Sequence, residues 1–164
     1  MKLNWQELRK KQAQLDEPIM INAGLKEHEV IDKRILSLLV ELGELANELP
    51  EVFKYWSNKK NNYSAALVEY VDVLHFILSI ENYYDFKDIN VGSIRQYDEV
   101  TQFTVMNHNI AGITIDEKHR DAKLTSIRGH FIGLGEMLGF SNDEINNAYN
   151  RKYEVNLQRQ ANGY

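Results

Sequence analysis

The chain has 164 residues, 43% of them hydrophobic, which is enough to bury the core of one domain. It contains no cysteine, which excludes disulfides and thiolate metal sites and suits a reducing cytoplasm. A formal net charge of -5 argues against binding to duplex nucleic acid. The polar segment 1–11 does not resemble a signal peptide, and no run of about 18 apolar residues predicts a membrane span.

Hydrophobic residues recur with helical periodicity along nearly the whole chain. Polar stretches at residues 57–63 and 85–93 interrupt this pattern and predict loops. Ser141, with Glu144 three residues later, forms a capping box for a last helix that reaches about residue 160. The other expected helices span about residues 4–23, 27–56, 64–84, 94–110 and 118–138. We therefore expect an all-α fold, a single-domain bundle of about five to six helices covering residues 1–164.

Two acidic side chains interrupt the most apolar of these helices. Twelve of the sixteen residues from 65 to 80 are apolar, which leaves the helix without a polar face and predicts that it is buried. Glu69 and Asp72 nevertheless lie within it, three residues apart and on one side. A buried, unpaired carboxylate costs several kcal/mol unless a cation or hydrogen bonds compensate.

The preceding helix carries a matching strip of carboxylates. Glu41, Glu44 and Glu48 follow at i, i+3 and i+7, beside an apolar stripe of leucines. If the two helices pack antiparallel, the E-x-x-E motif faces the E-x-x-D motif. Four facing carboxylates favour a hard divalent cation, magnesium or manganese rather than zinc. The alternative for E-x-x-E alone is an ordinary solvated helix face.

Cationic and amide side chains lie on one side of the last helix. Lys152, Asn156 and Arg159 follow at i, i+4 and i+7, so they can form a cradle for phosphate oxygens. The alternative is an exposed helix with scattered cations.

Three further features have structural explanations. His75 follows Asp72 by three residues, but no E-x-x-H motif accompanies it, so we expect it in the core or beside a pocket rather than on a metal. Trp56, taken alone, is expected to pack at a helix end. The glycines of the segment 129–139 follow no predicted strand, which favours a loop or a close contact with a helix over a dinucleotide-binding turn.

Several segments together resemble one family. LLVELGELANELPEVFKYWSNK (38–59), EYVDVLHFILSIE (69–81) and YNRKYEVNLQRQANGY (149–164) are similar to the dimeric all-α dUTPases, which belong to the all-α nucleoside triphosphate pyrophosphatase superfamily with the MazG-type enzymes. QAQLDEPIM (12–20) resembles the first motif of that family. The segment 86–139 matches weakly.

The resemblance implies a homodimeric enzyme that cleaves dUTP, and also dUDP, to dUMP with release of diphosphate or phosphate. It implies two or three Mg²⁺ ions per site, with Mn²⁺ as a substitute, and a water molecule activated by the metal with the help of Glu41 or Glu44. The residues that it assigns are metal ligands (Glu41, Glu44, Glu69 and Asp72), nucleoside contacts (Gln12, Asp16 and Trp56) and phosphate contacts (Lys152, Asn156 and Arg159).

Two other functions stay open at this point. One is a related pyrophosphatase that acts on another nucleotide such as dCTP, which the metal ligands cannot distinguish. The other is a non-catalytic helical regulatory or interaction protein, and an enzyme of this kind can also bind a regulatory protein of unknown identity. We expect a cytoplasmic protein, in a bacterial cell or a phage-infected host, without membrane or duplex nucleic acid as a partner.

Overall fold

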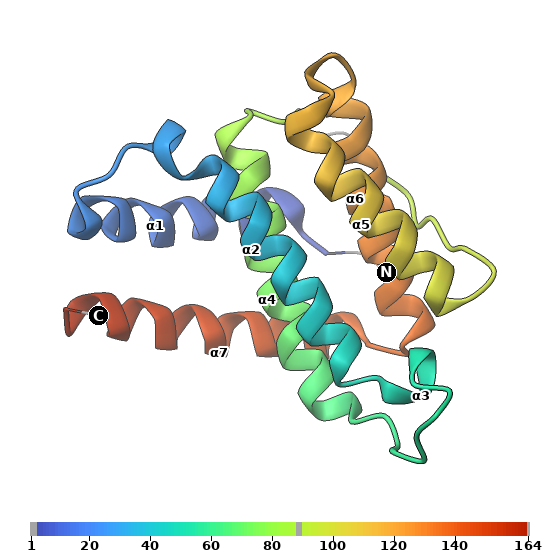
Figure 1. The fold of residues 1–164 in the computed structure, drawn as a ribbon. Helices are drawn as coiled ribbons and strands as arrows, with labels where there is room; N and C mark the ends of the chain where they lie inside the picture. Colours follow the sequence, from blue (N-terminus) through green and yellow to red (C-terminus); the bar gives the residue numbers. More distant parts are fainter. Residues whose placement is uncertain (1–2, 88–89, 164) are drawn as a thin grey trace.

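The computed structural model describes residues 3–87 and 90–163, and every regular element in these ranges is helical, as predicted (Figure 1). Residues 88–89 of the expected loop lie outside the described residues. The elements in chain order are α1 (Trp5–Ala23), α2 (Glu27–Asn47), α3 (Pro50–Phe53), α4 (Tyr63–Tyr83), α5 (Glu99–Ile115), the 3₁₀ turn η1 (Glu117–His119), α6 (Arg120–Met137) and α7 (Asn142–Ala161).

Local sequence signals set most helix ends. The side chain of Asn4 accepts a hydrogen bond from the backbone of Glu7 at the start of α1, and Gly24 ends that helix in the left-handed conformation, with φ of 64°. The predicted capping box at Ser141 begins α7. The expected helix 27–56 stops instead at Asn47, because Pro50 disfavours helical geometry at the residue before it and starts the separate helix α3.

The expected helix 94–110 is displaced in the structure to Glu99–Ile115. Asp98 sets this boundary, because its side chain accepts a hydrogen bond from the backbone of Thr101. The preceding residues 90–98 are irregular and lie against α6, where the backbone N–H of Ile94 donates to the carbonyl of Gly129 at 2.9 Å. The buried amide of Gln102 donates to the carbonyl of Ile94 at 2.9 Å and holds the same segment.

The segment 90–98 approaches α6 closely at glycine, as the sequence indicated. A Cβ atom on Gly133 would lie 2.1 Å from the carbonyl oxygen of Ile94. Gly133→Ala is therefore expected to lower the free energy of unfolding by about 2–3 kcal/mol, measured by urea denaturation. Gly92→Ala in the same segment meets no atom within 4 Å and is the matched control. Equal stability of the two variants would contradict this account.

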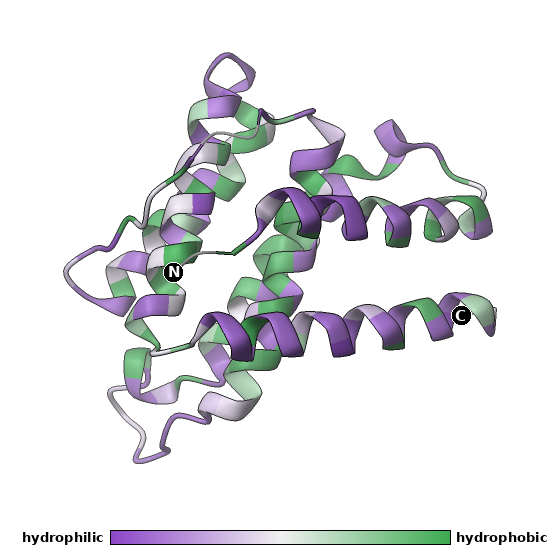
Figure 2. Ribbon diagram, turned by 180° about the vertical axis from the view of Figure 1, so that it is seen from behind, coloured by the Kyte–Doolittle hydropathy of each residue, from purple (hydrophilic) through white to green (hydrophobic). Residues whose placement is uncertain are grey.

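Helix α4 is the centre of the bundle and packs against α1, α2, α6 and α7. It has the length and hydropathy of a membrane span, but 56% of that window is buried by other parts of the described chain. Figure 2 shows the apolar α4 enclosed by helices that carry polar residues outward. We therefore assign α4 as the core helix of the bundle, in agreement with the prediction that it is buried.

A buried ion pair joins α4 to α6. The guanidinium of Arg128 donates to both carboxylate oxygens of Glu81, at 2.8 and 2.6 Å, and both side chains are almost fully buried. The rings of Trp5 and Phe86 cover the guanidinium at 4.6 and 4.9 Å. This contact ties the half of the bundle formed by α5 and α6 to the central helix.

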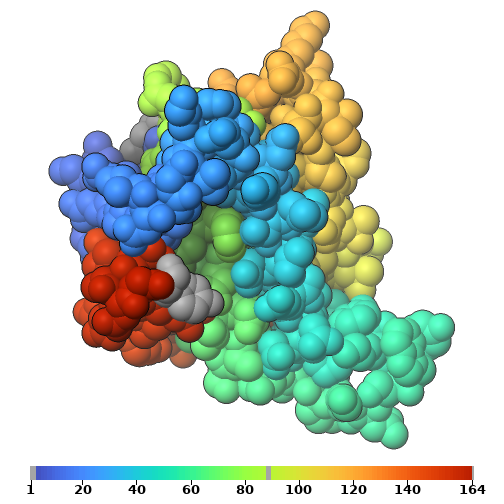
Figure 3. Space-filling view, turned by 60° about the vertical axis from the view of Figure 1, so that its left-hand side comes forward, coloured from blue at the N-terminus to red at the C-terminus, as the bar shows by residue number. Residues whose placement is uncertain are grey.

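The arrangement places α1 and α7 beside one another on one side of the α2–α4 pair, and α5 and α6 on the other (Figure 1). Figure 3 shows a hollow between the blue α1–α2 region and the red α7, with green atoms of α4 at its floor. The first and last helices of the described chain thus border one opening onto the core helix.

Candidate active site

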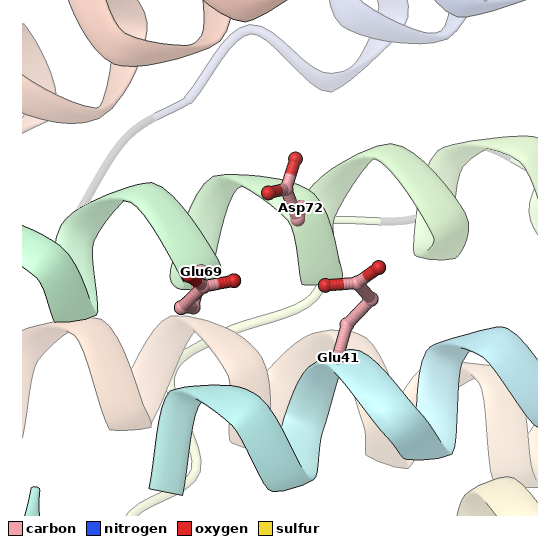
Figure 4. A group of neighbouring side chains, drawn as sticks. All are labelled: Glu41, Glu69 and Asp72. Carbon is pink, nitrogen blue, oxygen red and sulfur yellow. The ribbon is translucent and has the colours of Figure 1, made fainter. Parts of the chain in front are cut away.

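Three of the predicted acidic residues converge between α2 and α4. Glu41 from α2, and Glu69 and Asp72 from α4, each offer an oxygen atom, and these oxygens lie within 4.8 Å of one another (Figure 4). The buried leucines of α2 hold this face of the helix against α4, so the carboxylates meet at the edge of the apolar contact. We call these three residues the carboxylate cluster.

The carboxylate cluster holds its negative charge at an electrostatic cost. Partial burial, and then the charges of Asp72, Glu44 and Glu69, raise the pKa of Glu41 to about 7. The pKa values of Glu69 and Asp72 are also raised, in each case mainly by burial. Carboxylates that repel one another in a partly buried site are the oxygen donors that a hard divalent cation stabilises, so the cluster fits such an ion.

Glu44 lies next to this cluster but is not part of it. Its side chain is solvent-exposed, and it does not belong to the group of oxygens within 4.8 Å. Its charge nevertheless raises the pKa values of Glu41, Glu69 and Asp72, so it lies within electrostatic range of all three. A three-residue step turns Glu44 about 60° around the helix from Glu41, which explains its exposure.

A cavity of about 460 Å³ opens beside the carboxylate cluster and is lined by residues of α1, α2, α4 and α7. Glu41 and Asp72 line it together with apolar side chains such as Leu15 and Phe76. The sequence-predicted residues that share this cavity are Gln12, Asp16, Glu41, Asp72, Lys152, Asn156 and Arg159. A cavity with both a charged and an apolar wall can hold a ligand that has a phosphate chain and a base.

The three residues of α7 that the sequence predicts on one side of that helix all line this cavity. The ammonium of Lys152 donates to Oδ2 of Asp72 at 2.6 Å and opposes the rise in the pKa of that carboxyl group. Asn156 and Arg159 line the same cavity one and two turns further along α7. Positive charge therefore lies directly beside the acidic cluster.

Gln12 and Asp16 belong to a hydrogen-bonded chain at the cavity wall. The amide nitrogen of Gln12 donates to Asp16 at 2.8 Å, and the hydroxyl of Ser79 donates to the other oxygen of Asp16 at 2.6 Å. Nδ1 of His75 lies 2.7 Å from the amide oxygen of Gln12. Burial raises the pKa of Asp16, while the hydrogen bond from Ser79 opposes this rise.

Trp56 lies away from this cavity. It follows α3, is 67% exposed, and contacts the rings of Phe53 and Tyr55. It is not among the residues that line the cavity. Within one copy of the chain, the structure does not bring Trp56 together with Gln12 and Asp16.

Two basic residues of the cavity wall were not predicted from the sequence. Lys33 and Arg34 line it from α2. Lys33 precedes Ser37 and Glu41 by one and two helical turns, so the spacing i, i+4, i+8 contained this signal. Ser79, which also lines the cavity, follows His75 by four residues on α4, so it lies on the same side of that helix.

Comparison with known proteins identifies the family. A search of curated proteins found no match. A family model described as dUTPase matches residues 4–164, a range that includes the carboxylate cluster and all four helices that line the cavity. The match spans nearly the whole chain, and the all-helical fold agrees with it. The chain therefore belongs to the dUTPase family, the enzymes that hydrolyse dUTP.

Proposed function

We propose that the protein hydrolyses dUTP, and also dUDP, to dUMP in a magnesium-dependent reaction, with release of diphosphate or phosphate. The observation that carries the proposal is the convergence of Glu41, Glu69 and Asp72 beside a cavity. That cavity is lined by cationic side chains and by apolar side chains. Bound Mg²⁺ supplies charge neutralisation at the phosphates and makes water more acidic. We also propose that residues 1–164 act as one catalytic domain.

Each acidic residue of the site has a role that follows from its position. Glu41, Glu69 and Asp72 hold the cation, since their oxygens already lie close together. Glu44 lies outside this group, so its carboxylate is free of that first ion and helps to hold the further ions of a site with two or three in total. Glu41 or Glu44 accepts the proton of the attacking water in this proposal.

Residues of α7 and of α1, on two sides of the cavity, orient the substrate. Lys152, Asn156 and Arg159 bind the phosphate chain, because charge-assisted hydrogen bonds from α7 reach the space beside Asp72. Gln12 and Asp16 bind the nucleoside from the opposite wall, on α1.

We propose a homodimer in which Trp56 contacts the nucleoside in the cavity of the other protomer. The support is that Trp56 is exposed and lies off the cavity of its own chain. Leu36 and Val40 add exposed apolar surface to one face of α2, which suits a contact with a second copy. Sedimentation equilibrium of the wild type and of Trp56→Ala measures the assembly, and a monomeric wild type would contradict the proposal. Within the cell, we propose the cytoplasm as its location.

A nucleotide panel tests the substrate assignment. Diphosphate release is measured for the eight common ribo- and deoxyribonucleoside triphosphates and dUTP, with Mg²⁺, Mn²⁺ or EDTA. We expect preference for dUTP, activity with Mg²⁺ and Mn²⁺, and none with EDTA. Preference for another nucleotide, such as dCTP, would refute the assignment, and full activity in EDTA would refute the metal role.

The pH dependence of stability tests the carboxylate cluster without catalysis. Folding raises the pKa of Glu41 from 4.5 to about 7, so the folded protein holds this proton more tightly than the unfolded chain does. The resulting contribution to stability is fully present below pH 4.5 and is lost as the pH rises to about 7. Glu41→Gln removes this repulsion. In EDTA, we expect the variant to melt at a higher temperature than the wild type at pH 8, and at about the same temperature at pH 5.

Magnesium should reverse the order of the two proteins at pH 8. The ion stabilises the wild type, whose carboxylates are ionised, and has less effect on Glu41→Gln, which lacks one ligand. Differential scanning calorimetry with EDTA or MgCl₂ measures both effects. If the wild type and Glu41→Gln have equal melting temperatures in EDTA at pH 8 as well as at pH 5, the electrostatic account is wrong.

A further inference from the structure

One buried polar atom, on a side chain that lines the cavity, has no hydrogen-bond partner. Among the buried side-chain nitrogen and oxygen atoms of the described residues, Nε2 of His75 forms no hydrogen bond. His75 is 6% exposed and lines the cavity between Asp72 and Ser79 on α4. A buried polar atom without a partner costs free energy, and a hydrogen bond from a bound ligand would remove that cost.

The neighbouring hydrogen bonds determine which proton His75 carries. The amide nitrogen of Gln12 donates to Asp16, so its amide oxygen points toward His75 and Tyr149. That oxygen accepts from the hydroxyl of Tyr149 at 3.2 Å and can only accept from His75, at 2.7 Å. Nδ1 therefore carries the proton, and Nε2, on the opposite side of the ring, presents a lone pair.

The ring stays neutral and fixed in orientation. Burial, assisted by the charge of Lys152, lowers the pKa of His75 to about 3. The ring stacks on Tyr149, with centroids 4.4 Å apart and 17° between the planes. His75 thus offers a hydrogen-bond acceptor, and no donor, at Nε2 throughout the neutral pH range.

Resting on the proposed hydrolysis of dUTP, we infer that Nε2 of His75 accepts a hydrogen bond from the ring N–H of uracil and so selects uracil over cytosine. Uracil carries a proton on the ring nitrogen between its two carbonyl groups. Cytosine has a lone pair on the same nitrogen, so two acceptors would face each other. Leu15 and Phe76 line the same cavity and provide apolar surface for the base.

Two substitutions test the roles of the two imidazole nitrogens of His75 one at a time. The amide group of His75→Asn lies near the position of Nδ1, so this variant keeps a donor for Gln12 and loses the acceptor at Nε2. The longer side chain of His75→Gln places its amide near the position of Nε2 and is the matched control. Both residues are neutral, so neither changes the charge of the cavity.

The measurement is kcat/KM for dUTP and for dCTP with each protein. We expect the wild type to prefer dUTP and His75→Asn to lose roughly 10- to 100-fold of this preference, mainly through slower reaction with dUTP. His75→Gln should retain more of the preference than His75→Asn. Circular dichroism is expected to show that both variants are helical.

The outcomes separate this inference from the proposed function. A wild type that does not hydrolyse dUTP overturns the proposed function. A wild type that hydrolyses dUTP, together with an unchanged preference in folded His75→Asn, overturns only the role of His75.

Nitrogen NMR of the wild type decides the matter if His75→Asn does not fold. We expect an unprotonated Nε2 whose resonance shifts when dUMP is added with Mg²⁺, and does not shift with dCMP. A proton on Nε2 in the free protein, or the same response to both nucleotides, would overturn the inference.

Discussion

Asp72→Asn is expected to reduce magnesium-dependent dUTP hydrolysis roughly 1000-fold, because it removes one negative charge from the carboxylate cluster proposed to hold Mg²⁺. It also weakens the contact through which Lys152 is held at 2.6 Å beside the cluster. Asparagine has nearly the same shape as aspartate, and the site gains stability from losing a repelling charge. Circular dichroism should therefore show a folded, helical protein, and the loss should appear in kcat for diphosphate release.

Glu154→Gln is the matched control for this experiment. Glu154 is an exposed carboxylate of α7 that does not line the cavity, so its neutralisation should leave kcat unchanged. Glu69→Ala and Asp72→Ala should reproduce the loss of turnover in folded proteins. Near-normal hydrolysis by any of the three cluster variants would show that the carboxylate cluster is not the catalytic metal site.

Glu81→Leu is expected to have the largest effect on stability, a loss of about 3–5 kcal/mol in the free energy of unfolding. The substitution leaves the buried guanidinium of Arg128 without the carboxylate that accepts two of its hydrogen bonds. This loss is a large fraction of the roughly 5–15 kcal/mol that stabilises a typical domain. Urea denaturation followed by circular dichroism measures it.

A double variant tells whether Glu81→Leu loses stability through the broken ion pair or through altered packing. Glu81→Leu combined with Arg128→Met replaces both charges with apolar groups and should recover much of the stability. Glu51→Gln, in the exposed pair between Glu51 and Lys60, should leave the urea midpoint unchanged. A single variant as stable as the wild type would show that the buried pair does not hold α4 to α6.

Fold class and most helix positions could be predicted because they depend on local signals. The capping box at Ser141 and the apolar segment 65–80 are both readable from neighbouring residues, and both are present in the structure. The start of α5 was placed wrongly because the apolar residue Ile94 looked like part of a helix. Ile94 instead packs against glycines of α6, a contact made with residues 35 to 39 positions away that periodicity does not encode.

The candidate site could be predicted in part for a similar reason. Glu69 and Asp72 stood out because carboxylates are costly inside an apolar helix, and Glu41 followed from the helix beside it. Neither the exposure of Glu44 nor the position of Trp56 off the cavity follows from spacing, because both depend on how helices are rotated and connected. The role inferred for His75 required the hydrogen bonds of Gln12, which α1 contributes from far away in the sequence.

The cavity draws one wall from α1 and another from α7, and the contributing residues are at least 129 positions apart, as between Ala23 and Lys152. During synthesis on the ribosome, the acidic ligands emerge long before the cationic wall exists. A nascent chain or a fragment that ends before α7 would thus carry the carboxylate cluster but lack the cationic wall of the cavity. On the proposed function, such an incomplete chain should lack turnover, because the cavity is complete only when α7 has folded beside α1.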